Sequence, residues 1–315
     1  MKNDAITSLA TFMAWLERNP VPAGKVAVFR GHPDVAFDLK PSVFRNEIRV
    51  AREHLLLREL IAVHPGEFQA DVGVLEELVR MQHYTLPTRL LDVTWNPLVA
   101  LWFASEAFEK MVETGVKTKS GRPALRSVKT PGEIVRLVLD EDLVRYFDSD
   151  RVSCIANLAR CTPKQKTDLR RLLDARPTTA AEKKMFNNQP TVRRLLHFIR
   201  GEKPAFEAEI EPEHLDGIYL VKPKMNNRRI LAQEGAFLAF GLLPELLPTG
   251  TAEIKIDRIR IDTRNKGRIR KQLAQLSVNE RTLFPEIDRA ARYLTDELQT
   301  SDLLSRGSSP ASSVR

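Results

Sequence analysis

One stretch restricts the fold of this chain more than any other: residues 96–104, which read NPLVALWFA. Asparagine is a favourable helix N-cap and proline is favoured at the first helical position, so Asn96 and Pro97 predict the start of a helix. From Leu98 to Ala104 every residue is apolar, so this helix has no face suited to water. A helix that is apolar on all sides is a buried one. The sequence therefore predicts a buried central helix, expected over residues 96–109.

Helical and strand patterns surround this segment in mixed order. Apolar residues recur at helical spacing in some stretches and alternate with polar residues in others. The expected helices are 5–18, 46–62, 74–83, 264–276 and 285–299, together with shorter helical pieces within 160–203. The expected strands are 25–30, 133–140, 217–221, 236–241 and 252–261, and residues 114–131 are expected to form a loop. Because strands and helices do not alternate in a regular βαβ order, the sequence favours a mixed α+β fold.

The length and composition of the chain indicate one globular domain. Its 315 residues are 43% hydrophobic and 29% charged, which is ordinary for a folded protein. We expect a single domain over residues 1–300, followed by a flexible, serine-rich tail over 301–315. No apolar run reaches the roughly 20 residues that span a bilayer, and two cysteines in a chain of this length suit a reducing compartment. The sequence therefore predicts a cytoplasmic protein with Cys154 and Cys161 in its core.

The positive charge of the chain is concentrated in one segment. The formal net charge is +8, and residues 160–203 contain twelve lysines and arginines against four acidic residues. Such a basic helical insertion could face nucleic acid or another polyanion. A solvated helix face, or a docking surface for an acidic partner such as an antitoxin or another defence protein, would explain the same charge. The candidate contacts are Lys164, Lys166, Arg170, Arg171, Arg193 and Arg194.

The motifs of several common enzyme classes do not occur in this sequence. It has no GxGxxG or GxxxxGK[ST] phosphate loop, no HExxH zinc motif and no GxSxG nucleophile elbow. The six histidines show no metal-ligand spacing, so no metal site is predicted. A metal-dependent nuclease is disfavoured for the same reason, since no paired carboxylates stand at metal-binding spacing.

Four other stretches carry polar residues in distinctive apolar settings. They read FRGH at residues 29–32, QHYTLPTRLLDVTWNPLVALWFA at 82–104, RRILAQEGAF at 228–237 and TLFPEID at 282–288. Together they resemble the FRG domain family, and the resemblance runs from about residue 25 to about residue 295. Thr85 stands where the family usually has glycine, and Val93 where it usually has tryptophan. We expect Thr85 to alter the turn that follows His83 and Tyr84.

The resemblance to the FRG domain implies a fold and a ligand. FRG domains are similar to distant members of the ADP-ribosyltransferase superfamily, which bind NAD in a cleft between two small sheets. That similarity implies small split sheets with surrounding helices, and it implies NAD as a substrate. Many of these enzymes place an arginine or histidine at the end of the first strand and an acidic or amide residue near the last motif. By this resemblance Arg30 matches the first position, and Gln233 or Glu234 matches the second.

The chemistry of these residues is compatible with that expectation. A guanidinium such as that of Arg30 can bind a pyrophosphate with two hydrogen bonds, and a glycine such as Gly31 allows close approach to the backbone. Cleavage of the nicotinamide–ribose bond builds positive charge on the sugar, which a carboxylate stabilises. Glu234 could serve in that way, whereas Gln233 could only hydrogen-bond a ribose hydroxyl. Strand alternation predicts that only one of these two faces the cleft.

Further residues of the motifs are expected to take part in cofactor binding. Tyr84 or Phe237 could stack on the nicotinamide ring, and His83 and Arg89 complete the expected cofactor-binding set. Structural roles remain open for the polar members. Arg30 could pair with Asp92 or another carboxylate, His83 and Tyr84 could close a helix, and Gln233 could hold backbone. Arg89 could form an i,i+3 ion pair with Asp92.

Two functions from different classes follow from the resemblance. The first is an ADP-ribosyltransferase-like enzyme that uses NAD to modify a nucleic acid or a protein, as a bacterial toxin or phage-defence effector. The alternative is a non-catalytic module that senses a nucleotide or a nucleic acid within a defence system. A catalyst would lose turnover but keep NAD affinity when its acidic or amide residue is changed. Neither function calls for a metal.

Overall fold

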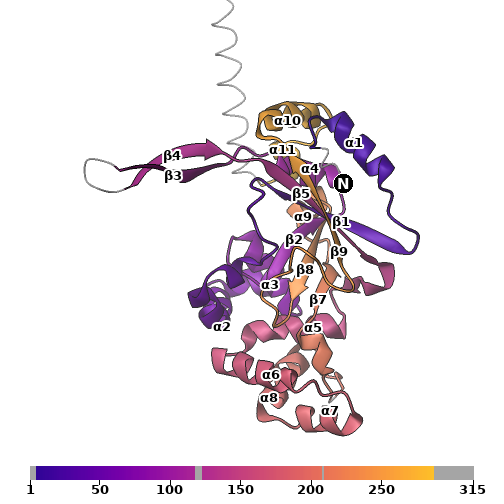
Figure 1. Ribbon diagram of the computed structural model, residues 1–315. Helices are drawn as coiled ribbons and strands as arrows, with labels where there is room; N and C mark the ends of the chain where they lie inside the picture. The colour runs from indigo at the N-terminus through magenta and orange to yellow at the C-terminus, as the bar shows by residue number, and fades with distance from the viewer. Residues whose placement is uncertain (1–4, 118–122, 208, 287–315) are drawn as a thin grey trace, which may run out of the picture.

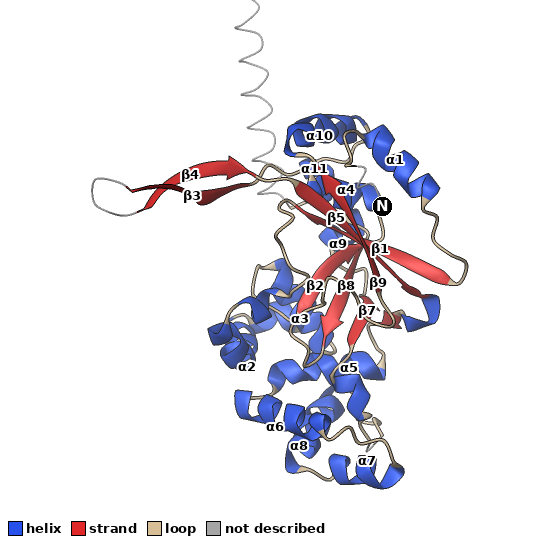
Figure 2. Ribbon diagram, viewed as in Figure 1, coloured by secondary structure: helices blue, strands red, loops and turns tan. Residues whose placement is uncertain are grey.

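Seven strands form one sheet at the centre of the molecule. The structure is a computed structural model that describes residues 5–117, 123–207 and 209–286. The strand order is β6-β7-β8-β2-β1-β5-β9, and neighbouring strands are antiparallel except for β6 and β7. Figure 2 draws the strands in red. The strands are β1 (Lys25–His32), β2 (Leu90–Thr94), β5 (Gly132–Asp140), β6 (Arg145–Tyr146), β7 (Ile218–Lys222), β8 (Gly235–Phe240) and β9 (Lys255–Ile261).

Helices cover the sheet in two groups (Figure 1). The first group comprises α1 (Leu9–Arg18), α4 (Pro97–Ala104), α10 (Lys266–Gln275) and α11 (Glu280–Leu283). The second comprises α2 (Glu47–Val63), α3 (Val74–His83), α5 (Asp150–Ala156), α6 (Pro163–Asp174), α7 (Ala180–Asn187), α8 (Pro190–Glu202) and α9 (Arg228–Ala232). The mixed α+β class is therefore confirmed.

The first helical group packs on β1, β5 and β9. Phe29, Ile134 and Ile259 point from these strands into a cluster with apolar residues of α1, α4, α10 and α11. As predicted, α4 is buried, although it ends at Ala104 rather than at 109. It also touches the backbone of the sheet, because a Cβ added to Gly31 would lie 2.0 Å from the Ala100 carbonyl oxygen. The sheet therefore needs glycine at this position for the central helix to pack against it.

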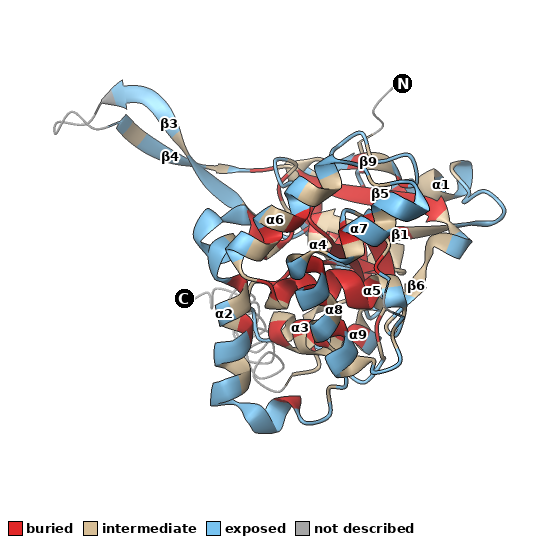
Figure 3. Ribbon diagram, turned by 90° about the horizontal axis from the view of Figure 1, so that it is seen from below, coloured by how far each residue is buried: buried red, intermediate tan, exposed pale blue. Residues whose placement is uncertain are grey.

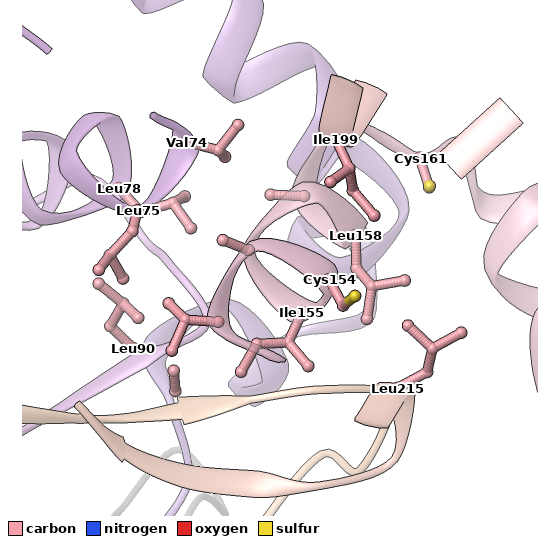
Figure 4. Close-up of a cluster of buried hydrophobic side chains, with 14 of the residues drawn as sticks. Val74, Leu75, Leu78, Leu90, Cys154, Ile155, Leu158, Cys161, Ile199 and Leu215 are labelled. Atoms are coloured by element: carbon pink, nitrogen blue, oxygen red, sulfur yellow. The ribbon is translucent and has the colours of Figure 1, made fainter. Parts of the chain in front are cut away.

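The second helical group packs on the same face of the sheet, over β2, β7 and β8. Leu90 and Phe237 point from the strands into a cluster built largely from α3, α5 and α8, and Figure 4 shows its side chains. Both cysteines lie in this cluster as predicted, and burial raises the pKa of Cys154 to about 12 and of Cys161 to about 11. Leu39, Val43 and Leu246 belong to the cluster that covers the opposite face.

The basic segment 160–203 forms α6, α7 and α8, which lie below the sheet in Figure 1. Pro163 and Pro190 occupy the first turns of α6 and α8, where a missing amide hydrogen costs nothing. The helical pieces predicted here are therefore confirmed. Burial differs among the helices of the second group. In Figure 3, α5 is mostly buried, whereas α2 is largely exposed.

The predicted loop over 114–131 is wrong. Residues Glu109–Lys117 (β3) and Pro123–Lys129 (β4) form a two-stranded hairpin that projects from the body (Figure 1). Its lysine-, serine- and threonine-rich composition resembles a loop because neither face is buried in a core. The predicted helix over 285–299 and tail over 301–315 lie outside the described residues, apart from 285 and 286, which are not helical. No helix among the described residues is long and apolar enough to cross a membrane.

Candidate functional site: the seam between β1 and β2

The central sheet opens between β1 and β2. Among the described residues β1 pairs with β5 along its whole length, but it pairs with β2 only at Phe29 and Thr94. Beyond this pair the two strands diverge, and Arg30 spans the gap. Its Nη1 atom donates to the Asp92 carbonyl oxygen at 2.5 Å. The side chain thus replaces hydrogen bonds that the two strands do not make, and we call this opening the seam.

Arg30 is held in the seam by a buried neighbour. Its Nε donates to Nε2 of His32 at 3.0 Å, and the side chain is 19% exposed. Burial lowers the pKa of Arg30, while Asp92, whose Oδ2 lies 4.0 Å from Nη1, raises it. Burial and then the Arg30 charge lower the pKa of His32 to about 3, so this imidazole is neutral near pH 7. His32 therefore orients the guanidinium as a hydrogen-bond acceptor.

Three adjoining pockets run from the seam across the sheet. A pocket of about 140 Å³ lies in the seam itself, and Asp92, Val93, Arg229 and Gln233 line both it and a second pocket of about 80 Å³. The second continues through His83 and Asn227 into a third of about 130 Å³. Each pocket shares lining residues with the next, and we call the three pockets together the motif groove. Its polar lining is Arg30, Arg80, Gln82, His83, Tyr84, Asp71, Glu76, Asp92, Thr94, Lys224, Asn226, Asn227, Arg229 and Gln233.

The motif groove is where the four sequence motifs meet. Arg30 comes from the first motif, Asp92 from the second and Gln233 from the third. The fourth motif reaches the same place, because Nε2 of Gln233 donates to the Leu283 carbonyl oxygen at 3.0 Å. The four segments are therefore neighbours in space although they span most of the chain.

Of the two candidates near the last motif, Gln233 lines the groove and Glu234 does not. Gln233 caps the end of α9, and Glu234 follows it with a φ of 45°, which turns the chain. The Glu234 carboxylate instead accepts from Nδ2 of Asn96 at 2.9 Å, at the start of α4. This places Glu234 outside the groove, and its predicted catalytic position is corrected accordingly. Adjacent residues at a turn, like those in a strand, point different ways, so only one of the pair faces the groove.

The carboxylate that does lie in the seam is that of Asp92. Its side chain is 63% exposed and lines the seam pocket and the second pocket. Arg229 lies nearby, with its guanidinium 4.7 Å from the centre of the Phe284 ring and no hydrogen bond to a described residue. Sequence reasoning missed both as site residues, although the adjacent arginines 228 and 229 open the third motif.

Arg89 and Lys166 belong to a buried ion cluster away from the groove. Arg89 is 1% exposed and makes two hydrogen bonds to the Glu53 carboxylate, at 2.9 and 2.7 Å. Lys166 Nζ lies 2.5 Å from the same carboxylate. Burial alone would raise the pKa of Glu53, but these two cations lower it to about 2. Neither cation is accessible, so Arg89 is not placed to bind a cofactor and Lys166 is not placed to contact nucleic acid.

The remaining predicted residues are dispersed. Tyr84 is 54% exposed at the far end of the groove, its ring edge-on to His83, and it does not lie beside Arg30. His83 lines the middle of the groove, with Nδ1 3.8 Å from Glu286 Oε1. Phe237 is 5% exposed and lines the second pocket. Gly31 also lines the seam pocket. Its close contact with α4 alone explains why this position must be glycine, because a Cβ would not fit there.

The other basic candidates are exposed on the helical segment below the sheet and do not line the groove. Arg170 donates to the Leu242 carbonyl oxygen at 3.1 Å, and Arg171 pairs with Asp168 at 2.9 Å. Arg194 lies over the Phe198 ring at 4.8 Å. All five positions, Lys164, Arg170, Arg171, Arg193 and Arg194, are in the exposed class.

Comparison with known proteins identifies one family. Searches of curated proteins and of solved structures each found no significant match. The FRG domain matches residues 25–112, a range that includes β1, α3, β2 and α4. That range supplies Arg30, His83 and Asp92 to the motif groove. On this evidence the chain contains an FRG domain, matched at residues 25–112.

Proposed function

We propose that this protein is an ADP-ribosyltransferase-like enzyme that binds NAD in the motif groove. The observation that carries the proposal is the seam, where the sheet opens and two guanidiniums and one carboxylate line a single pocket. The resemblance implied two small sheets, whereas the strands here form one seven-stranded sheet, so the proposal is supported by the local opening beside Arg30 near the end of β1.

The side chains of the seam suit a pyrophosphate flanked by ribose groups. Arg30 and Arg229 supply the two positive charges, and planar guanidiniums bind phosphate oxygens with paired hydrogen bonds. Arg30 is already oriented by His32, which reduces the entropy lost on binding. Gln233 offers an amide to a ribose hydroxyl. The groove continues beyond the seam for two further pockets, as an extended dinucleotide requires.

The proposed reaction uses Asp92 as the acidic group. The bond between nicotinamide and ribose C1′ breaks, and the electron pair leaves with nicotinamide. A nucleophilic atom of the acceptor forms the new bond to C1′. The carboxylate of Asp92 stabilises the positive charge that develops on the sugar and takes the proton that the acceptor releases.

The acceptor and the biological setting are parts of the same proposal. The exposed arginines of the helical segment favour an anionic acceptor, and nucleic acid is the first choice over protein. We propose that the protein acts in the cytoplasm, as a toxin or phage-defence effector. Its activity would then require control by a partner.

One observation favours a second function, a non-catalytic nucleotide sensor. The carboxylate of Glu234, expected to act on the ribose, is instead bonded to Asn96 outside the groove. The residue that takes its place, Gln233, is a neutral amide that can bind a ribose but cannot balance positive charge. A site of this kind would hold NAD or a related nucleotide without turnover.

The variants Asp92→Asn and Glu234→Gln distinguish these functions. Purified protein is incubated with labelled NAD, cell extract and nucleic acid, and NAD affinity is measured separately by calorimetry. For the enzyme, we expect Asp92→Asn to lower transfer by about 100-fold or more, as for loss of a key electrostatic group, and to change the Kd by less than about threefold. Glu234→Gln is the matched control and retains transfer.

Arg30→Ala completes the experiment. We expect it to weaken NAD binding and transfer together, because it removes a pyrophosphate contact. NAD binding by the wild type without transfer or hydrolysis would support the sensor. If the wild type does not bind NAD at all, both functions are rejected.

A further inference from the structure

Positive charge is also concentrated outside the helical segment 160–203. Residues 258–271 contain seven lysines and arginines against one acidic residue, Asp262, which is a denser excess than twelve against four over 160–203. They span the end of β9, the turn after it and the first half of α10. Four of the seven cations are exposed: Arg260, Arg264, Arg268 and Lys271.

The fold directs these four side chains to solvent. The buried side of α10 carries Lys266, Ile269 and Leu273. Arg264, Arg268 and Lys271 repeat at the same helical spacing on the other side of this helix and of the turn before it. Arg260 is an exposed residue of β9, which is the outermost strand of the sheet. Together they form a continuous run of cations along this end of the molecule.

The charge of this run is largely uncompensated. The side chains of Arg260, Arg268 and Lys271 make no hydrogen bond or ion pair with a described residue. Arg264 has only its neighbour Asp262, at 3.1 Å, and its side chain is 88% exposed. In the helical segment, by contrast, several cations already pair with carboxylates: Arg160, Lys183 and Lys203 with Glu77, Glu211 and Asp150. Unpaired cations on one surface are complementary to a polyanion.

The β3–β4 hairpin leaves the body beside this run of cations (Figure 1). Nζ of Lys266, the first residue of α10, donates to the carbonyl oxygen of Glu106 at 2.9 Å, three residues before β3 begins. The hairpin is therefore fixed to α10 at its base. It contributes two further exposed cations without an ion pair to a described residue, Arg126 and Lys129. We call Arg126, Lys129, Arg260, Arg264, Arg268 and Lys271 the arm surface.

The shape of the hairpin narrows the choice of polyanion. Among the described residues β3 and β4 pair only with each other, so both edges of this ribbon are open. Met111, Glu113, Leu125 and Ser127 share one face through their register, and all four are exposed. A free two-stranded ribbon fits the major groove of B-form DNA, which is about 12 Å wide. The deep, narrow major groove of an RNA duplex does not admit one.

We propose that the arm surface binds double-stranded DNA, with the hairpin in the major groove and the cations of β9 and α10 on the phosphates. No residue of the arm surface lines the motif groove, so this binding does not require NAD. The role of the DNA as acceptor rests on the proposed function. Its position suits that role, because Arg270 of α10 lies 4.1 Å from the Trp102 ring of α4, and the next residue, Phe103, lines the seam pocket.

Fluorescence anisotropy with a labelled DNA duplex of mixed sequence tests the proposal on the full chain without NAD. The affinity is measured over a range of sodium chloride concentrations. We expect the logarithm of the binding constant to fall linearly with that of the salt concentration, by about 0.9 for each phosphate contact. An RNA duplex and a single DNA strand of the same sequence are expected to bind at least about tenfold more weakly, because neither offers the ribbon a wide major groove.

Three double variants, each of which removes two positive charges, locate the binding. The first combines Arg268→Gln with Lys271→Gln, and the second combines Arg126→Gln with Lys129→Gln. Each is expected to weaken binding of the DNA duplex by about tenfold or more and to reduce the salt slope by about two. The matched control combines Lys184→Gln with Arg193→Gln, which are exposed in the helical segment, and it is expected to bind as the wild type does.

Four results would overturn the proposal. They are no binding of the DNA duplex, equal affinity for the RNA duplex or the single strand, wild-type affinity in either arm-surface variant, and an equal loss in the control. Circular dichroism confirms that each variant is folded. The affinity of the wild type for NAD, measured separately, keeps the two proposals distinct: loss of one binding activity leaves the other standing.

Discussion

At the scale of single residues, Arg30 combines a structural and a binding role. Its guanidinium is fixed by His32 on one side and by the Asp92 carbonyl on the other, yet it still lines the seam pocket. Positioning of this kind depends on a neutral imidazole, because a protonated His32 could not accept from Nε and would repel the guanidinium. The protonation of His32 is therefore coupled both to folding and to the shape of the site.

This coupling predicts a pH dependence. The pKa of His32 is about 3 in the folded protein and near 6.5 when unfolded, so between these values the unfolded chain binds more protons. We expect the free energy of unfolding to fall as pH is lowered from 6.5 to 4.5, with His32 contributing up to about 1.4 kcal/mol per pH unit. His32→Gln keeps an acceptor for Arg30 and should reduce this slope. Urea unfolding at several pH values measures it, and equal slopes in both proteins would contradict the assignment.

Thr85 gives a second prediction at this scale. It adopts a φ of 65°, in the left-handed region that β-branched residues avoid. We expect Thr85→Gly to raise the free energy of unfolding by about 1 kcal/mol, since glycine adopts this conformation without steric cost. Thr85→Ala keeps a Cβ, so its free energy of unfolding should rise by less than that of Thr85→Gly. Urea unfolding compares the three proteins, and a glycine variant less stable than the wild type would refute the explanation.

Arg30, which the sequence marked as a candidate, lines the seam pocket, and so does Asp92, which the sequence did not mark as a site residue. The arginine interrupts an apolar strand, so its pattern alone marks it. Asp92 sits in LLDVT, where one polar residue in a strand is ordinary and the gap beside it depends on how β1 and β2 diverge. Glu234 had the right chemistry for a catalytic carboxylate, but a left-handed turn directs it toward Asn96.

At the scale of elements, the packing of α4 on the sheet determines the geometry of the seam. The helix lies against β1 so closely that Gly31 has no room for a Cβ, and its residues Val99 and Phe103 form one wall of the seam pocket. Anything that lifts α4 from the sheet therefore widens the pocket and weakens the core together.

Gly31→Ala is predicted to do both. The added Cβ would lie 2.0 Å from the Ala100 oxygen and 2.6 Å from the Ala104 nitrogen, so backbone must move. We expect a loss of about 3 kcal/mol of unfolding free energy, at the upper end for overpacking. Gly66→Ala is the matched control, because a Cβ there meets nothing within 4 Å. Chemical denaturation compares the two, and similar stability in both variants would exclude the close contact.

Whether an element could be predicted from the sequence depended on how its residues are buried. Helices with one apolar face, such as α3, were located from spacing, and α4 from its continuous apolar run. The hairpin of β3 and β4 gave no such signal, because Met111 and Leu125 are exposed at 60% and 55%. β2 was missed because it is short and nearly every residue in it is buried, which removes the alternation that marks a strand.

At the scale of the whole molecule, a buried ion cluster ties the helical segment to the sheet. Glu53 in α2 joins Arg89, just before β2, to Lys166 in α6. The cluster removes one of the six basic candidate contacts, Lys166, from the accessible surface of the segment. The net charge can be counted from the sequence. That Lys166 is the buried lysine cannot, because its partner Glu53 lies 113 residues away in the chain.

Glu53→Gln is predicted to destabilise the whole fold. It leaves two buried cations without a counter-charge, at a cost of about 3–5 kcal/mol. Glu59→Gln, on an exposed position of the same helix, should change the unfolding free energy by less than about 0.5 kcal/mol. Because the pKa of Glu53 is about 2, the contribution of this carboxylate is present above pH 4.5 and is lost as pH falls toward 2. Denaturation at neutral pH tests the difference, and equal stability of the two variants would exclude the role given to the cluster.

The seam also has a mechanical meaning for the molecule. A continuous sheet resists bending because every strand is bonded to the next along its length, but β1 and β2 share one registered pair. The two halves of the sheet are therefore joined at the seam by one backbone pair, by the Arg30 side chain and by the apolar cluster on the opposite face, which contains residues of both β1 and β2. A ligand that bridges Arg30 and Asp92 would add a further link across the seam, between two strands that share a single backbone pair.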